Sequence, residues 1–461
     1  MKRIFYLAAF CSLITLTSLA QKETPPEGGT AKDFKLSAKQ NLNYSNGLRS
    51  TLVHYGTVPK VTISLIIKTG NVHETTNQIW LADLTGRLLR EGTAKMNFAE
   101  LSKRTAMMGG SLNITVGLAQ TTISGSVLSE YAADFIQLVS DLVINPAFPA
   151  SEVGRLKSDL KRRLAVQRSV PQSLAQEKFF QAVYGDQRYG KTFPTEQMID
   201  GYTAETVKDF YNQNFGAKRS VIYVVGSFDE SAVKKAIASS LTKWKEGPEV
   251  NYPKIEAMPV NDTLVIDRKG APQTTVMIGL PILTPDNKDY IPMIVTNSLL
   301  GGSFGSRITS NIREDKGYTY SPFSALNNRK GSSVWYEQAD VTSEHTVESL
   351  LEIEKEIKKL GAIEPSKEEL KGIQNYEAGI FVLQNSSPAG IIGQLNFLDL
   401  YGLPDSYLDS YVKNIHAVTP AMVTETANTY IKYDNMAKVM VGDKEQIEKQ
   451  IKTQKEKQKA F

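Results

Sequence analysis

The chain has 461 residues, of which 41% are hydrophobic and 22% are charged, so it is long enough for more than one hydrophobic core and lacks the composition of a disordered or fibrous protein. The formal net charge is +4, and removal of a leader that carries Lys2 and Arg3 would leave +2. So small a net charge is too little to argue for nucleic-acid binding, and we expect no nucleic-acid partner.

Residues 1–20 have the pattern of a secretory signal peptide. Lys2 and Arg3 precede an apolar run that ends in Ser18-Leu19-Ala20, a small-residue cleavage site. Cys11 is the only cysteine and lies inside this run, so the mature chain can form neither a disulfide nor a thiolate metal site. We expect an exported protein of the periplasm, with extracellular release as the alternative. A leader that stays uncleaved would be its only contact with a membrane.

Residues 21–40 are polar and contain two prolines and two glycines, which indicates a flexible lead-in. Residues 41–246 then alternate between β-branched runs and helical periodicity, as in a mixed α/β domain. The expected strands are Asn43–His54, Val61–Lys68, Ser111–Val116, Gln120–Leu128 and Ser220–Val225. The expected helices are Ile79–Glu91, Phe98–Met108, residues 129–145, 151–168 and 173–184, Thr203–Phe215, and a helix that Asp229 caps.

Residues 247–261 contain three prolines and show no period, so they are the expected linker. A second domain is expected over residues 262–443, and a tail rich in Lys, Gln and Glu follows over 444–461. The strands of this half are expected at Thr263–Arg268, Gln273–Leu280, Tyr318–Leu326, Ser332–Val341 and Ala437–Val441. Its helices are expected at Tyr290–Leu300 and at residues 344–360, 366–384, 387–400 and 419–431.

The second half repeats the first. Thr203 and Gly226 recur as Thr419 and Gly442, each 216 residues further along. In both halves a helix, a strand and the glycine follow in the same order and at the same spacing. A repeat of so long a period indicates duplicated domains, so we predict an α+β fold with two homologous α/β domains.

The stretch Leu299–Ser324, LLGGSFGSRITSNIREDKGYTYSPFS, combines a glycine pair, two arginines and an aromatic segment. The glycine pair permits a tight turn. Arg313 carries a fixed charge that binds a carboxylate or a polarised carbonyl, and Tyr320 supplies a hydroxyl seven residues later. Taken alone, Arg313 would as readily form a surface ion pair with Glu314 or Asp315, and Tyr320 would be a half-buried strand residue.

This stretch resembles the C-terminal-domain signature of the pitrilysin–insulinase family of zinc peptidases, which includes the mitochondrial processing peptidases. The resemblance implies two related halves that enclose a cleft. It also assigns Arg313 and Tyr320 as the pair that holds substrate over a zinc ion. In such proteins the zinc is bound in the other half of the molecule or in a partner chain.

The family binds zinc through H-x-x-E-H on the first helix of its N-terminal half. The frame around that motif is present here as Gly70, Glu74, Leu81-Ala82 and Gly92-Thr93. The motif positions themselves read DLTGR, which places Asp83 and Arg87 at the two histidine positions and Gly86 at the glutamate position. Gly86 offers no base, and Arg87 cannot ligate a cation because its guanidinium stays protonated.

The family's third ligand is an acidic residue, and by register it falls in Lys161–Leu164, where Arg163 is the nearest match. Cationic side chains at two ligand positions would repel zinc. Asp83 and Arg87 have the i,i+4 spacing of an ion pair, and we predict that this pair takes the place of the metal. We therefore expect no cofactor in this chain and zinc in a partner chain.

The four histidines offer no other zinc site, because no two of them have ligand spacing: His54, His73, His345 and His416. The segment His73–Asn77 comes near to H-E-x-x-H but ends in Asn. We expect His73 to be a solvated loop residue.

The segment Gly109–Val116 resembles the family's edge strand, which pairs with bound peptide. The resemblance assigns Asn113 and Ile114 to substrate binding, in which main-chain hydrogen bonds add the peptide as a further strand. An ordinary hairpin strand is the alternative.

Loss of the metal residues with retention of Arg313 and Tyr320 resembles the non-catalytic subunit of a two-chain zinc metallopeptidase. We expect such a chain to pair with a homologous zinc-bearing subunit, to bind peptide substrates and to cleave nothing alone. The alternative is a non-enzymatic scaffold or peptide-binding member of the family, which needs neither the partner protease nor the intact pair.

Overall fold

We describe the chain from a computed structural model that covers residues 35–258 and 260–459. The signal peptide expected at residues 1–20 and most of the expected lead-in lie outside these residues. Among the described residues, no helix is long and apolar enough to span a lipid bilayer.

A six-stranded sheet forms the core of the N-terminal half, with its strands in the order β1-β2-β6-β3-β5-β4. β2 and β6 are parallel, and the other neighbouring strands are antiparallel. β3 is buried along most of its length because α4 packs on it and α14 packs on it as well. The strands are β1 (Lys39–Asn43), β2 (Arg49–His54), β3 (Lys60–Ile67), β4 (Asn113–Val116), β5 (Thr121–Leu128) and β6 (Ser220–Gly226).

The helices of this half begin where the sequence supplies caps. Asn97, Thr203 and Asp229 each accept a hydrogen bond from the backbone N–H three residues further on, which satisfies a donor at the start of the helix. The helices are α2 (Leu81–Arg90), α3 (Phe98–Met107), α4 (Ala132–Ile144), α5 (Ala150–Ser169), α6 (Pro171–Tyr184), α7 (Glu196–Asp200), α8 (Ala204–Asn214) and α9 (Glu230–Ser240).

The C-terminal half contains a five-stranded sheet in the order β7-β11-β8-β10-β9. Its strands are β7 (Thr263–Asp267), β8 (Gln273–Ile282), β9 (Phe323–Asn327), β10 (Ser333–Thr342) and β11 (Ala437–Gly442). Its helices are α10 (Tyr290–Asn297), α11 (Arg307–Thr309), α12 (Thr346–Ala362), α13 (Lys367–Gln384), α14 (Pro388–Tyr401), α15 (Ser406–Asp409), α16 (Tyr411–Ala417), α17 (Pro420–Tyr430) and α18 (Lys444–Lys459). Apart from β1, the two sheets have the same strand order and the same single parallel pair, here β7 with β11. The repeat predicted from the sequence is therefore present in the fold.

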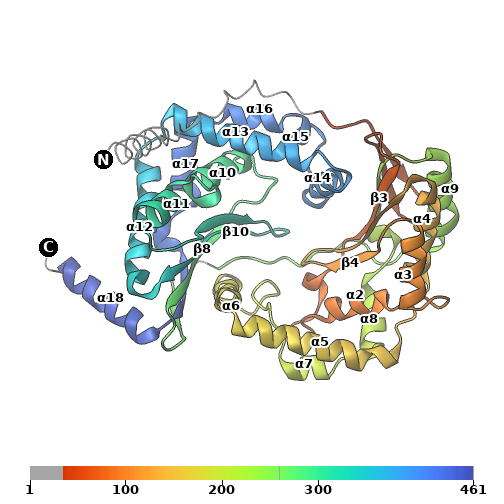
Figure 1. Ribbon diagram of the computed structural model, residues 1–461, viewed down its shortest axis with the longest axis horizontal. Coiled ribbons are helices and arrows are strands. Elements are labelled where there is room, and N and C mark those ends of the chain that lie inside the picture. Colours follow the sequence, from red (N-terminus) through yellow and green to blue (C-terminus); the bar gives the residue numbers. More distant parts are fainter. Residues whose placement is uncertain (1–34, 259, 460–461) are drawn as a thin grey trace, which may run out of the picture. The chain divides into compact units, whose positions relative to one another are not determined.

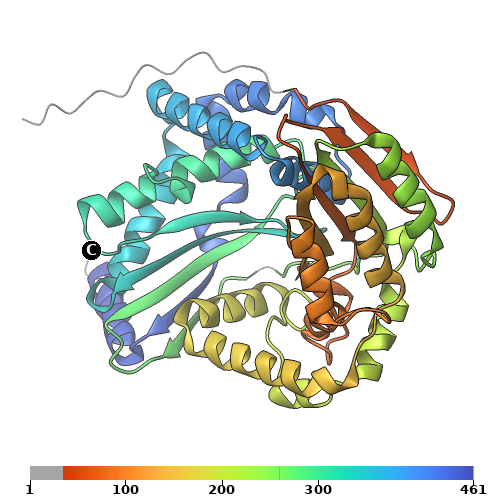
Figure 2. The same ribbon diagram turned by 45° about the vertical axis from the view of Figure 1, so that its right-hand side comes forward.

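Each half contributes one helix to the sheet of the other. α6 packs on β8 and β11, and α14 packs on β3 and β6. Both views show α6 beside β8 (Figures 1 and 2). Phe179 and Val183 of α6 share a buried apolar cluster with Met277 and Val439 of the second sheet. These contacts make the two halves parts of one packed unit.

Partly buried charges also join the two halves. Arg49 donates to both carboxylate oxygens of Asp399 on α14, at 2.6 and 3.0 Å, and Lys68 lies 2.7 Å from the same carboxylate. Burial alone would raise the pKa of Asp399, but these two cations hold that pKa below its ordinary value.

The hairpin turn before β10 places Arg329 in an aromatic cage on the other half. Its guanidinium carbon lies 3.7 Å from the ring centroid of Phe180, and the ring centroids of Tyr184 and Tyr189 are further away, at 5.2 and 5.0 Å. Nη1 also donates to the backbone oxygen of Tyr189 at 3.0 Å. Burial lowers the pKa of Arg329 to about 10. The contacts that stabilise the buried cation are the aromatic ring faces and the backbone oxygen of Tyr189.

The structure differs from the sequence prediction at the start of β9 and at the start of β1. The strand expected from Tyr318 begins instead at Phe323. Gly317 has φ of 66°, and the N–H of Tyr318 donates back to Ile312 at 2.8 Å, while Pro322 has no N–H to give to a strand ladder. The expected lead-in also overlaps β1, which begins at Lys39.

The segment expected as a charged tail forms the helix α18. The three short helices α7, α15 and α16 were not predicted from the sequence.

Candidate functional site

The carboxylate of Glu74 organises the start of α2. It is 4% exposed and accepts hydrogen bonds from the backbone N–H groups of Trp80 and Ala82, at 3.2 and 2.8 Å. Trp80 has φ of 68° and supplies no side-chain cap. Glu74 therefore serves as the cap of α2 from six to eight residues upstream.

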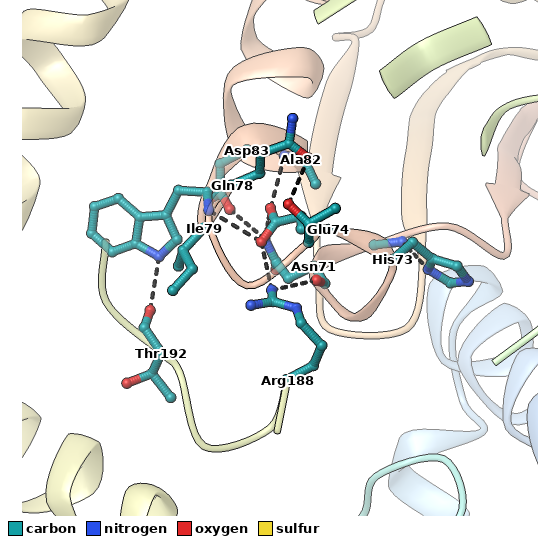
Figure 3. Close-up of polar contacts among 12 residues, drawn as sticks. Asn71, His73, Glu74, Gln78, Ile79, Ala82, Asp83, Arg188 and Thr192 are labelled. Carbon is teal, nitrogen blue, oxygen red and sulfur yellow. Dashed lines mark hydrogen bonds and ion pairs between the residues drawn. The ribbon is translucent and has the colours of Figure 1, made fainter. Parts of the chain in front are cut away.

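Two further donors complete the surroundings of Glu74 (Figure 3). Arg188 Nη2 lies 2.7 Å from Oε2, and Asn71 Nδ2 donates to Oε1 at 3.0 Å. Burial raises the pKa of Glu74 to about 7, against the opposing effect of Arg188 and the donated hydrogen bonds. The side chain of Arg188 is itself only 10% exposed, so the two charges depend on each other.

Asp83 is paired with Arg163, which corrects the expected pair between Asp83 and Arg87. Arg163 Nη1 on α5 lies 2.7 Å from Oδ1 of Asp83, and Asn71 Nδ2 donates to Oδ2 at 2.8 Å. The guanidinium of Arg163 also lies over the ring of Trp80, 4.5 Å from its centroid. This second contact holds Arg163 in place, whereas Arg87 forms no ion pair with Asp83 in the described part of the chain.

Gly86 faces the edge strand. A Cβ atom at this position would lie 2.7 Å from Cγ2 of Val116 and 3.6 Å from Cγ2 of Ile114. Val116 thus occupies the space into which any side chain at position 86 would project, so α2 packs more closely on β4 than a side chain there would allow.

His73 is not solvated as expected, because it lies half-buried in a short 3-10 turn, Asn71–His73. Its Nδ1 accepts from the N–H of Gly70 at 3.1 Å, so the proton of the neutral ring is on Nε2, which faces the backbone oxygen of Asn251 at 3.0 Å. Burial and the charge of Arg219 lower the pKa of His73 to about 4.

This geometry predicts an acid-sensitive contact at His73. The folded-state pKa is about 4, below the ordinary value of 6.5. The neutral ring therefore contributes its full stabilisation of the folded state above pH 6.5. As the pH falls toward 4, the free energy of unfolding decreases by about 1–3 kcal/mol. Urea unfolding from pH 7 to pH 4 should show a steeper loss for the natural chain than for His73→Asn. Parallel curves for the two proteins would contradict the prediction.

β4 ends the first sheet, and one of its edges has no strand partner among the described residues. Asn113 is exposed and Ile114 is half-buried, in keeping with an alternating edge strand. α2 packs directly against β4, so the structure brings the candidate peptide-binding residues next to Asp83 and Gly86.

Arg313 and Tyr320 lie together in the C-terminal half. Arg313 belongs to a π-helical turn, Ser310–Asp315, and its guanidinium carbon lies 4.9 Å from the ring centroid of Tyr320. Tyr320 is 79% exposed and lies before β9, so the expected half-buried strand residue is not found. The guanidinium also forms the ion pair expected with Glu314, from Nε at 3.1 Å.

Phe304 was not picked out from the sequence as a site residue. Its ring centroid lies 4.5 Å from the guanidinium carbon of Arg313, on a side chain that is 72% exposed. Asn71 and Arg188 were missed as well, because their roles arise from contacts and not from spacing. The exposure of an aromatic residue in a turn leaves no periodic signal in a sequence.

The comparison with protein families decides the identity of the two halves. The model of insulinase, peptidase family M16, matches residues 51–195, and the model described as peptidase M16 inactive domain matches residues 201–376. The chain belongs to the insulinase family.

Bacterial relatives in this family cover most of the chain. The uncharacterized zinc protease YmxG of Bacillus subtilis is 25% identical over 342 residues, which span 71% of this chain and 81% of the relative. The non-peptidase homolog YmxG of Helicobacter pylori is 22% identical over 394 residues, which span 84% of this chain and 90% of the relative.

Solved structures share the insulinase-family fold. The peptidase M16 inactive domain from Pseudomonas fluorescens matches with a TM-score of 0.82 at 24% identity, over 88% of this chain and 98% of that one. The periplasmic protease PqqL of Escherichia coli matches with a TM-score of 0.76 at 18% identity, over 95% of this chain and 50% of that one.

The residues at the family's metal positions do not fit a zinc ion. Asp83 is the one oxygen ligand among them, and Arg163 and Asn71 already occupy its carboxylate. Gly86 and Arg87 supply no ligand, and no group of three or more His, Cys, Asp or Glu residues suited to a metal occurs in residues 35–258 and 260–459. The chain therefore lacks the family's H-x-x-E-H motif at these positions.

Proposed function

We propose that this chain is the non-catalytic, substrate-binding subunit of a two-chain zinc metallopeptidase, to which it lends Arg313 and Tyr320. The observation that carries the proposal is the contact between exposed Tyr320 and half-buried Arg313, with 4.9 Å between guanidinium carbon and ring centroid, in a chain whose own metal positions do not fit zinc. A homologous subunit with intact H-x-x-E-H would supply the zinc and the general base.

The polar contacts of residues near Arg313 support the proposal that Arg313 binds a ligand. Arg307 makes two bonds to Glu369 at 2.7 and 2.9 Å, and Asn311 donates to Glu352 and Glu356 at 2.9 and 2.8 Å. Both of these polar neighbours are thus paired with carboxylates of α12 and α13.

Arg313 differs from them because, among the described residues, it pairs only with the adjacent and exposed carboxylate of Glu314, which lies 3.1 Å from Nε. An exposed pair of this kind contributes little. The two Nη groups of Arg313 are thus open to a peptide carbonyl that becomes an oxyanion during hydrolysis.

Peptide binding would use the edge strand as well. β4 has the free edge that main-chain pairing requires, and Asn113 is exposed on it. We assign Asn113 and Ile114 to substrate binding on this basis. The sequence-tolerant nature of main-chain pairing suits a peptidase of broad substrate choice.

We place the protein in the periplasm. The leader pattern of residues 1–20 indicates export, and the structural relative PqqL is described as a periplasmic protease.

A non-enzymatic scaffold is the second candidate. It is favoured by the degenerate metal positions and by the name of the Helicobacter pylori relative, a non-peptidase homolog. Such a protein would bind peptide along β4 without any contribution from Arg313.

Reconstitution separates these two functions. The mature chain is mixed with a candidate partner, an H-x-x-E-H chain encoded beside it, and cleavage of unstructured peptides is measured for each protein and for the mixture. We expect activity only in the mixture, and none when the glutamate of the partner's motif is replaced by glutamine. A partner that is fully active alone, or a mixture that stays inert, would favour the scaffold.

A further inference from the structure

The turn that carries Phe304 lies tightly against the second sheet. A Cβ atom on Gly301 would lie 2.6 Å from Oγ of Ser324, and one on Gly302 would lie 2.3 Å from Nδ2 of Asn297. No residue with a side chain fits at these two positions without displacing a neighbour. The start of the turn is therefore fixed by its contact with α10 and β9.

The end of the turn is fixed too. The N–H of Ser306 donates to the backbone oxygen of Ser303 at 3.1 Å, and Oγ of Ser306 bonds Thr309 at 2.9 Å. The next residue, Arg307, makes its two bonds to Glu369 on α13. Phe304 thus projects from a short turn whose two ends are held by these contacts. The backbone of this turn sets the direction of the Cα–Cβ bond of Phe304.

Phe304 and Tyr320 both contact one guanidinium. Their ring centroids are 4.5 and 4.9 Å from the guanidinium carbon of Arg313, and both rings are mostly exposed. Ring faces attract a guanidinium and hold its plane. The N–H groups of a guanidinium point outward in its plane, so two ring contacts that hold the plane also set the direction in which Arg313 can donate to a ligand.

We propose that Phe304 is a positioning residue for Arg313, and that Phe304, Arg313 and Tyr320 act as one unit that presents the guanidinium edge to a peptide carbonyl. This inference rests on the proposed function. Phe304 touches the guanidinium and acts through it. Its loss would leave the guanidinium of Arg313 with one ring contact, that of Tyr320, and so with more freedom to change its orientation.

The size of the effect follows from the strength of the contact. A cation–π contact at an exposed site contributes about 0.5–1 kcal/mol, rising to about 2 kcal/mol when it is desolvated. We therefore expect Phe304→Ala to lower turnover by about 3- to 30-fold, which is less than the loss expected for Arg313→Ala. Turnover, kcat, should fall more than KM rises, because the guanidinium acts on the charge that forms in the transition state.

The experiment compares three replacements of Phe304 in the mature chain assembled with its zinc-bearing partner. Phe304→Ala removes the ring, Phe304→Leu keeps apolar volume without a ring face, and Phe304→Tyr keeps the ring. We expect kcat to fall for Ala and for Leu and to return for Tyr, with unchanged unfolding midpoints because the residue is exposed. In an Arg313→Ala background, Phe304→Ala should cause no further loss.

The controls separate this inference from the function on which it rests. If Arg313→Ala leaves turnover unchanged, both the proposed function and the role of Phe304 are overturned. If Arg313→Ala is slow but Phe304→Ala turns over like the natural chain, only the role of Phe304 is wrong. Full activity in Phe304→Leu, or a full additive loss in the double variant, would likewise show that Phe304 does not act through Arg313.

Discussion

Arg313→Ala is expected to lower kcat of the assembled two-chain peptidase by about 10²–10³-fold, the usual cost of removing one donor to an oxyanion. The ion pair of Arg313 uses Nε, and two ring contacts hold the guanidinium, so both Nη groups can donate to a carbonyl oxygen. Steady-state kinetics on the reconstituted pair would measure the loss, and co-purification would show that assembly is intact.

A matched control for this variant lies in the same turn. Lys316 is partly exposed, and its nearest carboxylate, on Glu352, is 3.9 Å away. Lys316→Ala removes one positive charge from the same surface and should turn over within about twofold of the natural chain. Tyr320→Phe keeps the ring and removes the hydroxyl, so it tests the second donor separately. Natural rates in both Arg313→Ala and Tyr320→Phe would end the assigned role of the pair.

Glu74→Ala is expected to cost about 3–5 kcal/mol of folding stability, because it removes one partner of a buried ion pair. Arg188 would be left with no carboxylate partner, and the N–H groups of Trp80 and Ala82 at the start of α2 would lose their acceptor. Urea unfolding followed by circular dichroism would measure the change in free energy.

A glutamate with a partly exposed side chain provides the comparison for Glu74. Glu152 pairs with Arg155 at 2.8 Å on the surface of α5, and Glu152→Ala should change stability by less than about 1 kcal/mol. A similarly small change for Glu74→Ala would show that the Glu74 cluster does not hold the start of α2.

Local sequence signals were enough to predict the positions of most helices and strands. Caps at Thr203 and Asp229 and the helical and strand periods located most elements, because these effects act within a few residues. The repeat of 216 residues predicted two related halves, and the two sheets have matching strand orders. The exchange of α6 and α14 between the sheets left no local signal.

The partners of charged side chains were not predictable in the same way. An i,i+4 ion pair contributes only about 0.3–0.5 kcal/mol, so tertiary contacts can override it. The packing of α5 brings Arg163 near Asp83, and the guanidinium of Arg163 also contacts the ring of Trp80. His73 is half-buried because Asn251, far along the chain, supplies its hydrogen-bond partner and Tyr252 packs beside it, with 5.3 Å between the ring centroids. Such contacts depend on tertiary structure, which spacing in the sequence does not show.

The central claim is that this chain works through the zinc of another subunit, and the most direct test measures zinc and peptidase activity in one preparation of the purified mature chain. The account predicts no stoichiometric zinc and no cleavage of unstructured peptides. One zinc per chain, together with activity that a chelator removes, would contradict the assignment of Asp83, Gly86, Arg87 and Arg163 as a lost metal site.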